Sequence, residues 1–208
     1  EWPLNNIITL RADTGDAFVK LLGVSNMLGR NSSNTAVLLI KNDSGFYSFY
    51  LDDFFDIHGL DKEKKYLCFS GDDITTSPHD EYFLKDVAEE VEKLNQKGHR
   101  LGIIFRRCPV DFSERYDKIL KDHKGLIVPI NPLWTGGEGY WSHAIPTKDD
   151  LHLQTNIIEY SFMVINVGSS MVFDYAAKGK PCAYLNYLPS VTNLEKDIRE
   201  VYSYTHFA

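Results

Sequence analysis

The sequence predicts an α/β fold, a Rossmann-like doubly wound parallel sheet. From residue 66 to residue 186, short apolar runs alternate with segments that have one apolar face at helical spacing. Most of the apolar runs end at a turn signal or at residues that suit the start of a helix. Apolar strands that alternate with amphipathic helices indicate a parallel sheet covered on both faces. In such a fold the crossovers are right-handed, and a ligand is expected beyond the carboxyl ends of the strands.

The first predicted strand covers residues 66–70 and ends at the turn signal that begins with Gly71. A helix is expected next, with Ser77 as its N-cap and Asp80 as the acid of a capping box. The helix should end at Gly98. Its predicted inner face is formed by five apolar residues: Phe83, Leu84, Val87, Val91 and Leu94.

The second predicted strand covers residues 101–105. Asp111 is expected to start the helix that follows, and Gly125 to end it. Four residues of that helix are expected to face inward: Phe112, Tyr116, Ile119 and Leu120. A third strand covers residues 126–130, where Pro129 favours an edge position because it lacks an N–H group.

A loop over residues 132–143 is the longest irregular segment of this region and the best candidate for a mobile loop. Its rings could stack on a sugar or a base, although packing within the loop explains them equally simply. The aromatic residues concerned are Trp134, Tyr140, Trp141 and His143. Thr147 and Asp150 then predict the start of the next helix.

The fourth predicted strand, residues 162–167, turns through Gly168, Ser169 and Ser170 directly into a helix. Gly179 to Pro181 break this helix before a fifth strand at residues 182–186. A last helix is expected to be capped by Thr192 and Glu195.

Two parts of the chain are distinguished. Residues 1–60 are interpreted as an N-terminal extension or the remnant of a preceding domain, and residues 61–208 as a Rossmann-like nucleotide-binding domain. In the first part a short helix is expected at residues 16–27 and a hairpin at residues 37–50. Residues 52–59 have the character of a linker.

Composition excludes several classes of function. Lys and Arg number 22 against 29 Asp and Glu, and the resulting net charge of -7 makes nucleic acid or an anionic membrane a poor partner. No apolar run approaches the roughly 20 residues of a spanning helix. Three widely spaced cysteines, Cys68, Cys108 and Cys182, fit neither a CxxC pair nor a zinc finger. Their apolar settings indicate reduced, buried thiols in a cytosolic protein.

The turn at Gly168, Ser169 and Ser170 is the sharpest chemical feature of the sequence. Backbone N–H groups, two hydroxyls and a helix start could hold a phosphate there, and Asp174 could take a ribose diol. The alternative is that the serines are ordinary N-caps and Asp174 a surface acid.

Arg106 and Arg107 follow the second strand and would lie at the same edge of the sheet. Guanidinium groups suit a diphosphate, although neighbours in an extended segment point in opposite directions, so one of the two is expected to be solvated or structurally paired. Ser70 and Gly71, after the first strand, would line the same crevice or form a simple turn.

Two pairs of acids, Asp72 with Asp73 and Asp149 with Asp150, could bind a divalent metal or act as a base. Both pairs fall at predicted turns or helix starts, where acids are favoured in any case. We therefore expect no metal and no cofactor.

Residues 164–186 resemble the C-terminal, donor-binding half of bacterial GT-B glycosyltransferases of polysaccharide biosynthesis, and are also similar to CDP-glycerol-type polyol-phosphate transferases. The segment from 65 to 105 fits more loosely. The resemblance implies that the diphosphate of a nucleotide sugar binds at Gly168, Ser169 and Ser170, and the ribose at Asp174. It places Ser70, Gly71 and Arg106 near the phosphates, and either Arg106 or Arg107 would stabilise the charge of the leaving group. Nucleotide-sugar epimerases use a similar turn, but with Asn-Ser-Gly-Gly and a Glu.

The resemblance implies glycosyl transfer from a nucleoside diphosphate sugar, without a bound metal, in the bacterial cytoplasm. Since a GT-B enzyme has two such domains, residues 1–59 are too few for the other one, and the chain is interpreted as a fragment without the acceptor domain and with unassigned catalytic residues. The alternatives are a CDP-linked polyol-phosphate transferase and a non-catalytic nucleotide-binding or scaffold domain. Nucleic acid is not expected as a partner, whereas the full-length protein could associate peripherally with a membrane.

Overall fold

A computed structural model describes residues 51–136, 143–189 and 197–203. Five parallel strands form one sheet in the order β3-β2-β1-β6-β7. They are β1 (Lys65–Ser70), β2 (Leu101–Arg106), β3 (Ile127–Pro129), β6 (Ser161–Asn166) and β7 (Cys182–Tyr184). A separate antiparallel pair joins β4 (Trp134–Thr135) to β5 (Ile145–Pro146). The predicted Rossmann-like parallel sheet is thus confirmed, and β3, with Pro129, lies at an edge.

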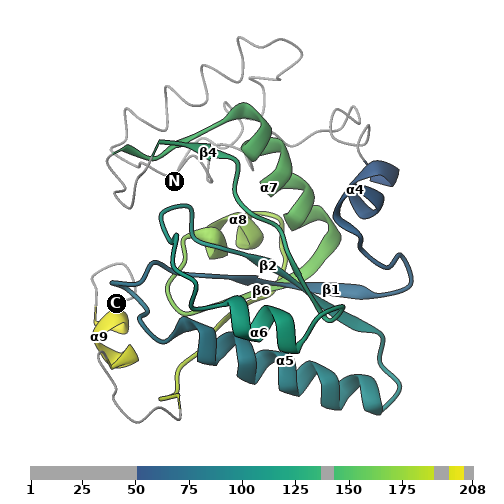
Figure 1. Cartoon of the computed structure of the whole chain (residues 1–208), viewed down its shortest axis with the longest axis horizontal. Coiled ribbons are helices and arrows are strands. Elements are labelled where there is room, and N and C mark those ends of the chain that lie inside the picture. The colour runs from purple at the N-terminus through teal and green to yellow at the C-terminus, as the bar shows by residue number, and fades with distance from the viewer. Residues whose placement is uncertain (1–50, 137–142, 190–196, 204–208) are drawn as a thin grey trace.

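Helices cover both faces of the sheet (Figure 1). They are α4 (Leu51–His58), α5 (Asp80–Gln96), α6 (Asp117–Asp122), α7 (Lys148–Tyr160), α8 (Met171–Ala177) and α9 (Ile198–Tyr202). In Figure 1, α5 and α6 lie on one side of the sheet, and α7 and α8 lie on the other. Two layers of helices around an apolar sheet give the three-layer arrangement typical of doubly wound folds.

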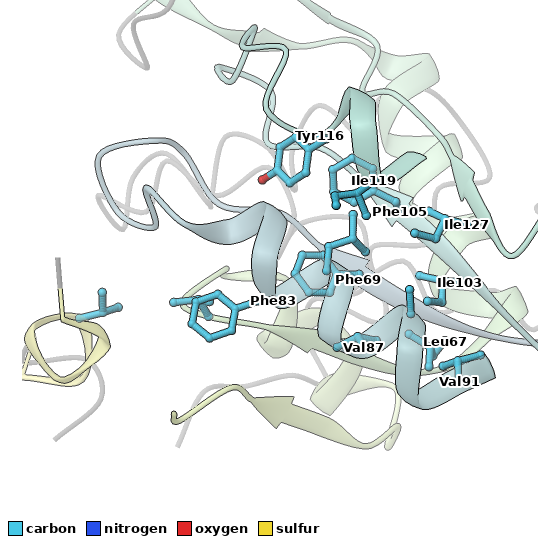
Figure 2. Packing of buried hydrophobic residues seen from close by; sticks show 14 residues of the cluster. Leu67, Phe69, Phe83, Val87, Val91, Ile103, Phe105, Tyr116, Ile119 and Ile127 are labelled. Atoms are coloured by element: carbon cyan, nitrogen blue, oxygen red, sulfur yellow. The ribbon is translucent and has the colours of Figure 1, made fainter. Parts of the chain in front are cut away.

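Each face of the sheet has its own apolar cluster, because successive residues of a strand point to opposite faces. On the α5 and α6 side, Phe69 and Phe105 pack with residues of both helices, including Tyr116 and Ile119 (Figure 2). On the other side, Cys68, Ile104 and Val164 pack with residues of α4, α7 and α8. The strands are therefore apolar on both faces, as the continuous apolar runs of the sequence predict.

The strand order places a topological switch point between β1 and β6. From β1 the chain adds β2 and then β3 on one side, and it later returns to place β6 and β7 on the other. The connections that leave β1 and β6 therefore diverge at the carboxyl edge of the sheet. In open α/β sheets this is the position where ligands bind.

The local predictions around α4 and the start of α5 are wrong. Residues 52–58 are not a linker but belong to α4, and Phe54 of this helix is buried in the cluster on the α7 side. Asp80 does not close a capping box with Ser77, because its carboxylate accepts hydrogen bonds from the Tyr116 hydroxyl and the Asp72 N–H group. The N-cap of α5 is His79.

The helix expected from Asp111 begins only at Asp117, because the Asp111 carboxylate instead accepts from the N–H and hydroxyl groups of Ser113. Phe112 is consequently 64% exposed rather than inward, whereas Tyr116 and Ile119 are buried as expected. Two further residues expected inside are exposed, Leu94 and Cys182.

The remaining predictions on the N-terminal part, the helix at 16–27 and the hairpin at 37–50, lie outside the described residues, as do residues 137–142 of the long loop and the cap at Thr192. The division of the chain at residue 60 stays a prediction. Thr147 does cap α7, since its hydroxyl accepts from the Asp150 N–H group at 3.1 Å.

Gly102 in β2 offers a first test of this packing. A methyl group there would lie 2.4 Å from the ring of Tyr66, whose hydroxyl accepts a hydrogen bond from the Asp61 N–H group. Because the ring is held at both ends, we expect Gly102→Ala to lower the free energy of unfolding by about 1–3 kcal/mol. Urea unfolding would measure the loss. In a Tyr66→Leu background the same substitution should cost clearly less, and equal costs in both backgrounds would contradict the proposed clash.

Candidate functional site

Three polar residues lie side by side where the central strands end. Ser70 of β1 is in register with Arg106 of β2, and Asn166 of β6 follows directly after the registered pair Phe69 and Ile165. Residues in register on parallel strands share a face, and these three share the face of α7 and α8. We call Arg106, Ser70 and Asn166 the polar row. All three are at most 3% exposed.

Helix α7 supplies the partner of the Arg106 guanidinium. Its Nη2 donates to both carboxylate oxygens of Asp150, at 2.9 and 2.8 Å, and reaches the side-chain oxygen of Gln154 at 3.4 Å. Asp150 is fully buried. The position of Arg106 is therefore fixed by a buried ion pair, with a charge that offsets its own.

Gln154 connects this ion pair to Asp174 of α8. Its amide nitrogen donates to Asp174 Oδ2 at 2.7 Å. Asp174 has no exposed surface, so it is not the surface acid of the alternative interpretation. Burial raises the pKa of its carboxyl well above the usual value, against the opposing effects of the Gln154 hydrogen bond and the charge of Arg106.

Three buried polar atoms around the row lack a hydrogen-bond partner within the described part of the chain. They are Arg106 Nη1, Asn166 Nδ2 and Asp174 Oδ1. Buried polar atoms are almost always paired, so unpaired ones point to a bound molecule or to a functional role. Two donors and one acceptor are the groups that a ligand with phosphate oxygens and hydroxyls would use.

The turn after β6 closes the row at its outer side. Ser70 Oγ donates to Ser169 Oγ at 2.8 Å, and the Ser169 N–H group donates to Asn166 Oδ1 at 3.1 Å. The Gly168 N–H group donates to Asp72 Oδ2 at 2.8 Å. Ser170 is the N-cap of α8, is exposed and makes no side-chain capping bond. The structure thus places Ser70 in contact with Ser169 and in register with Arg106, whereas Ser170 is exposed to solvent.

Gly71 and Arg107 have structural surroundings. The Gly71 N–H group donates to the Arg106 carbonyl, and a side chain at this position would meet the Tyr116 hydroxyl at 3.1 Å. Arg107 points away from the row, as alternation along an extended segment requires. Its guanidinium donates to the carbonyl of Ser113 at 2.6 Å and lies 5.2 Å from the ring centre of Tyr116. The structure gives Arg107 partners on the side of α6, away from the polar row.

A cluster of buried acids surrounds Arg115 on the opposite side of the sheet end. Arg115 donates to the carboxylate of Asp111 at 2.8 Å and to the carbonyl of Asp72 at 2.6 Å. Burial raises the pKa of Asp80 to about 6, although hydrogen bonding to Tyr116 and the charge of Arg115 act against this. Burial, together with the charge of Asp80, raises the pKa of Asp72 well above its usual value.

Sequence patterns do not single out Asn166, Gln154 or Arg115. An Asn at the end of an apolar strand is a weak signal, and a Gln on an otherwise apolar helix face is another. Arg115 offers no signal, since its partner Asp72 is 43 residues away in the chain. These roles depend on contacts that only the fold creates.

The cysteines offer no activated nucleophile. Burial raises the pKa of the Cys68 and Cys108 thiols to about 12, which leaves them protonated near neutral pH. Burial also raises the pKa of Cys182, although this thiol is exposed.

Residues 51–136, 143–189 and 197–203 contain neither a cluster of metal-binding side chains nor a membrane-spanning helix. No group of three or more His, Cys, Asp and Glu side chains is arranged to hold a metal ion in this part of the chain. None of its helices has the length and apolar character needed to cross a membrane.

Comparison with known proteins gives distant structural likenesses alone. No family model matches the chain, and no curated protein matches it. A UDP-GlcNAc 2-epimerase from Neisseria meningitidis bound to UDP-GlcNAc is 12% identical with a TM-score of 0.46, over 86% of this chain and 44% of that one. A UDP-GlcNAc 2-epimerase from Methanocaldococcus jannaschii is 18% identical with a TM-score of 0.41, over 86% and 46%. The chain spans less than half of either enzyme, and likeness at this level identifies neither a ligand nor a reaction.

Proposed function

We propose that this part of the chain binds the nucleoside diphosphate portion of a sugar donor and belongs to a glycosyltransferase. The observation that supports this most is the polar row at the switch point, with two unpaired buried donors and one unpaired buried carboxyl oxygen among the described residues. A nucleotide sugar carries both anionic oxygens and hydroxyls, and so it matches this set of groups. Ser70 and Ser169 add hydroxyls at the outer side of the row.

The roles in the reaction follow from charge. In glycosyl transfer an acceptor hydroxyl oxygen bonds to the anomeric carbon of the sugar and loses its proton to a base, while the bond from that carbon to the phosphate oxygen breaks and the diphosphate leaves with the electron pair. Arg106 Nη1 and Asn166 Nδ2 would donate to the phosphate oxygens as this negative charge grows. Asp174 Oδ1 would accept from a ribose or sugar hydroxyl. We assign no general base.

Nucleotide binding is tested by thermal shift with UDP, GDP, CDP and CMP at millimolar concentration. A ligand at about 100 times its Kd stabilises the folded state by about 2.7 kcal/mol, which for a chain of this size raises Tm by about 5–10 °C. Absence of a shift with all four nucleotides would contradict the proposal. A clearly larger shift with CDP than with UDP would favour the polyol-phosphate transferase instead.

Substitutions around the polar row test whether the nucleotide binds there. Asn166→Ala removes a donor of the polar row, and the double variant Ser169→Ala with Asp174→Ala removes a hydroxyl and a carboxyl beside the row. Both variants should therefore abolish the shift. Ser203→Ala is the matched control, since this serine after α9 is exposed and its hydroxyl donates to the main-chain carbonyl of nearby Glu200. If the row variants keep the full shift, the nucleotide binds elsewhere.

A further inference from the structure

The polar row is closed in this structure. Four side chains around it, those of Arg106, Asn166, Asp150 and Asp174, are at most 3% exposed. Two hydrogen bonds join the carboxyl end of β1 and the turn after it to the turn after β6. One is neutral and connects Ser70 to Ser169. The other connects the Asp72 carboxyl to the Gly168 N–H group at 2.8 Å.

The contact between Asp72 and Gly168 differs from the other because it includes an ionisable group in an apolar setting. Asp72 is 7% exposed. Arg115 donates to its main-chain carbonyl, so the hydrogen bond that holds the carboxyl itself comes from Gly168. An acid in this place brings negative charge to the edge of the sheet where the anionic ligand of the proposed function would enter.

We propose that the hydrogen bond from Gly168 to Asp72 is an autoinhibitory latch, which holds the turns after β1 and β6 together and must open before a nucleoside diphosphate reaches the polar row. This inference rests on the proposed function. The latch opposes binding in two ways. The hydrogen bond to a carboxylate is charge-assisted and so resists separation of the turns, and the carboxylate repels the diphosphate.

Several charged or titratable groups face Asp72. Asp80 and Asp73 oppose its ionisation, and Arg115 favours it. Three uncharged groups also lie within electrostatic reach of its carboxylate, from three different elements: Cys108, Tyr184 and Tyr202. The acidic neighbours and burial outweigh the hydrogen bond from Gly168 and the charge of Arg115, and the pKa of Asp72 is raised well above its usual value.

The direction of the pH effect follows. As the pH falls through the raised pKa, Asp72 gains a proton, the latch becomes a neutral hydrogen bond and the repulsion disappears. Binding of a nucleoside diphosphate should therefore tighten as the pH falls. Asp72→Asn imitates the protonated acid, since its side-chain oxygen can still accept from Gly168.

The test is calorimetric titration of UDP into the wild type and Asp72→Asn from pH 6 to pH 9. At pH 9 we expect UDP to bind Asp72→Asn about tenfold more tightly than the wild type, and the ratio to fall as the pH falls. Taking the ratio at each pH cancels the protonation of UDP itself. Asp73→Asn is the control, because it removes a carboxylate one residue away that accepts hydrogen bonds from Thr75 and Thr76. This variant should change the affinity for UDP much less.

The possible results distinguish failure of the latch from failure of the proposed function. If UDP binds the wild type and Asp72→Asn equally at every pH, or if Asp73→Asn has as large an effect, the latch is refuted and the proposed function stands. If UDP binds none of the proteins, the titration is repeated with the nucleotide that gives the largest thermal shift, and absence of binding with UDP, GDP, CDP and CMP alike overturns both the latch and the proposed function. Should Asp72→Asn fail to fold, the Gly168 amide proton in NMR spectra of the wild type supplies the test. Its chemical shift should titrate at the same pH as the UDP affinity, and a pH-independent shift would refute the latch.

Discussion

Replacing Asp150 with Ala is expected to lower the free energy of unfolding by about 3–5 kcal/mol. The carboxylate is fully buried and accepts from Arg106 at 2.9 and 2.8 Å, from the Leu133 N–H group at 2.7 Å and from the indole of Trp134 at 2.6 Å. Its removal leaves the Arg106 charge buried without a counterion. Equilibrium unfolding in urea would measure the loss.

A double variant separates the ion pair from simple loss of packing. Arg106→Met with Asp150→Leu removes both charges and keeps apolar volume, so it should be distinctly more stable than Asp150→Ala alone. Asp122→Ala is the control for an exposed pair, since the Asp122 carboxylate is bound by Lys118 on the surface of α6, and it should destabilise the fold far less than Asp150→Ala. A loss at Asp150 no larger than at Asp122 would mean that the buried pair contributes little to folding.

The sheet could be predicted because its signals are local. Continuous apolar runs mark strands buried on both faces, and Thr147 followed by Asp150 marks the start of α7. The helix at residues 51–58 was missed, although Phe54, Phe55 and His58 have helical spacing, because a segment of two turns is too short to decide between helix and linker. In the structure Phe54 and Phe55 pack in the apolar cluster on the α7 side. Helix formation there depends on tertiary contact, which outweighs local propensity.

The candidate site was predictable in position but not in detail. Ser70 and Arg106 end strands β1 and β2, and Ser169 lies in the turn after β6, so the meeting of the carboxyl ends of these strands brings them together. Which of two adjacent arginines faces the row depends on strand register, and register depends on the whole sheet. The partner of Arg106 is 44 residues away, so the role of Asp150 as its counterion has no local signal.

Because several buried acids have raised pKa values, we expect the free energy of unfolding to fall as the pH rises. Burial raises the folded-state pKa of Asp80 from 3.8 to about 6, so the folded chain binds its proton more tightly than the unfolded chain does. The stability linked to this proton is present in full below about pH 4 and is lost as the pH rises to about 6. Two pKa units at about 1.4 kcal/mol each amount to about 3 kcal/mol. Asp72 and Asp174, whose pKa values are also raised, extend the loss to higher pH.

Urea unfolding between pH 4 and pH 8 should therefore show the free energy of unfolding falling with pH, and Asp80→Asn should flatten the curve across pH 4–6. The Asn oxygen can still accept from Tyr116, which limits the structural change. Asp73 gives a control of opposite sign. Its hydrogen bonds to Thr75 and Thr76 lower its pKa despite partial burial, so its stabilisation is lost only as the pH falls below about 3.8. Asp73→Asn should leave the slope above pH 4 unchanged. An Asp80→Asn curve parallel to that of the wild type would show that the proton responsible is bound elsewhere.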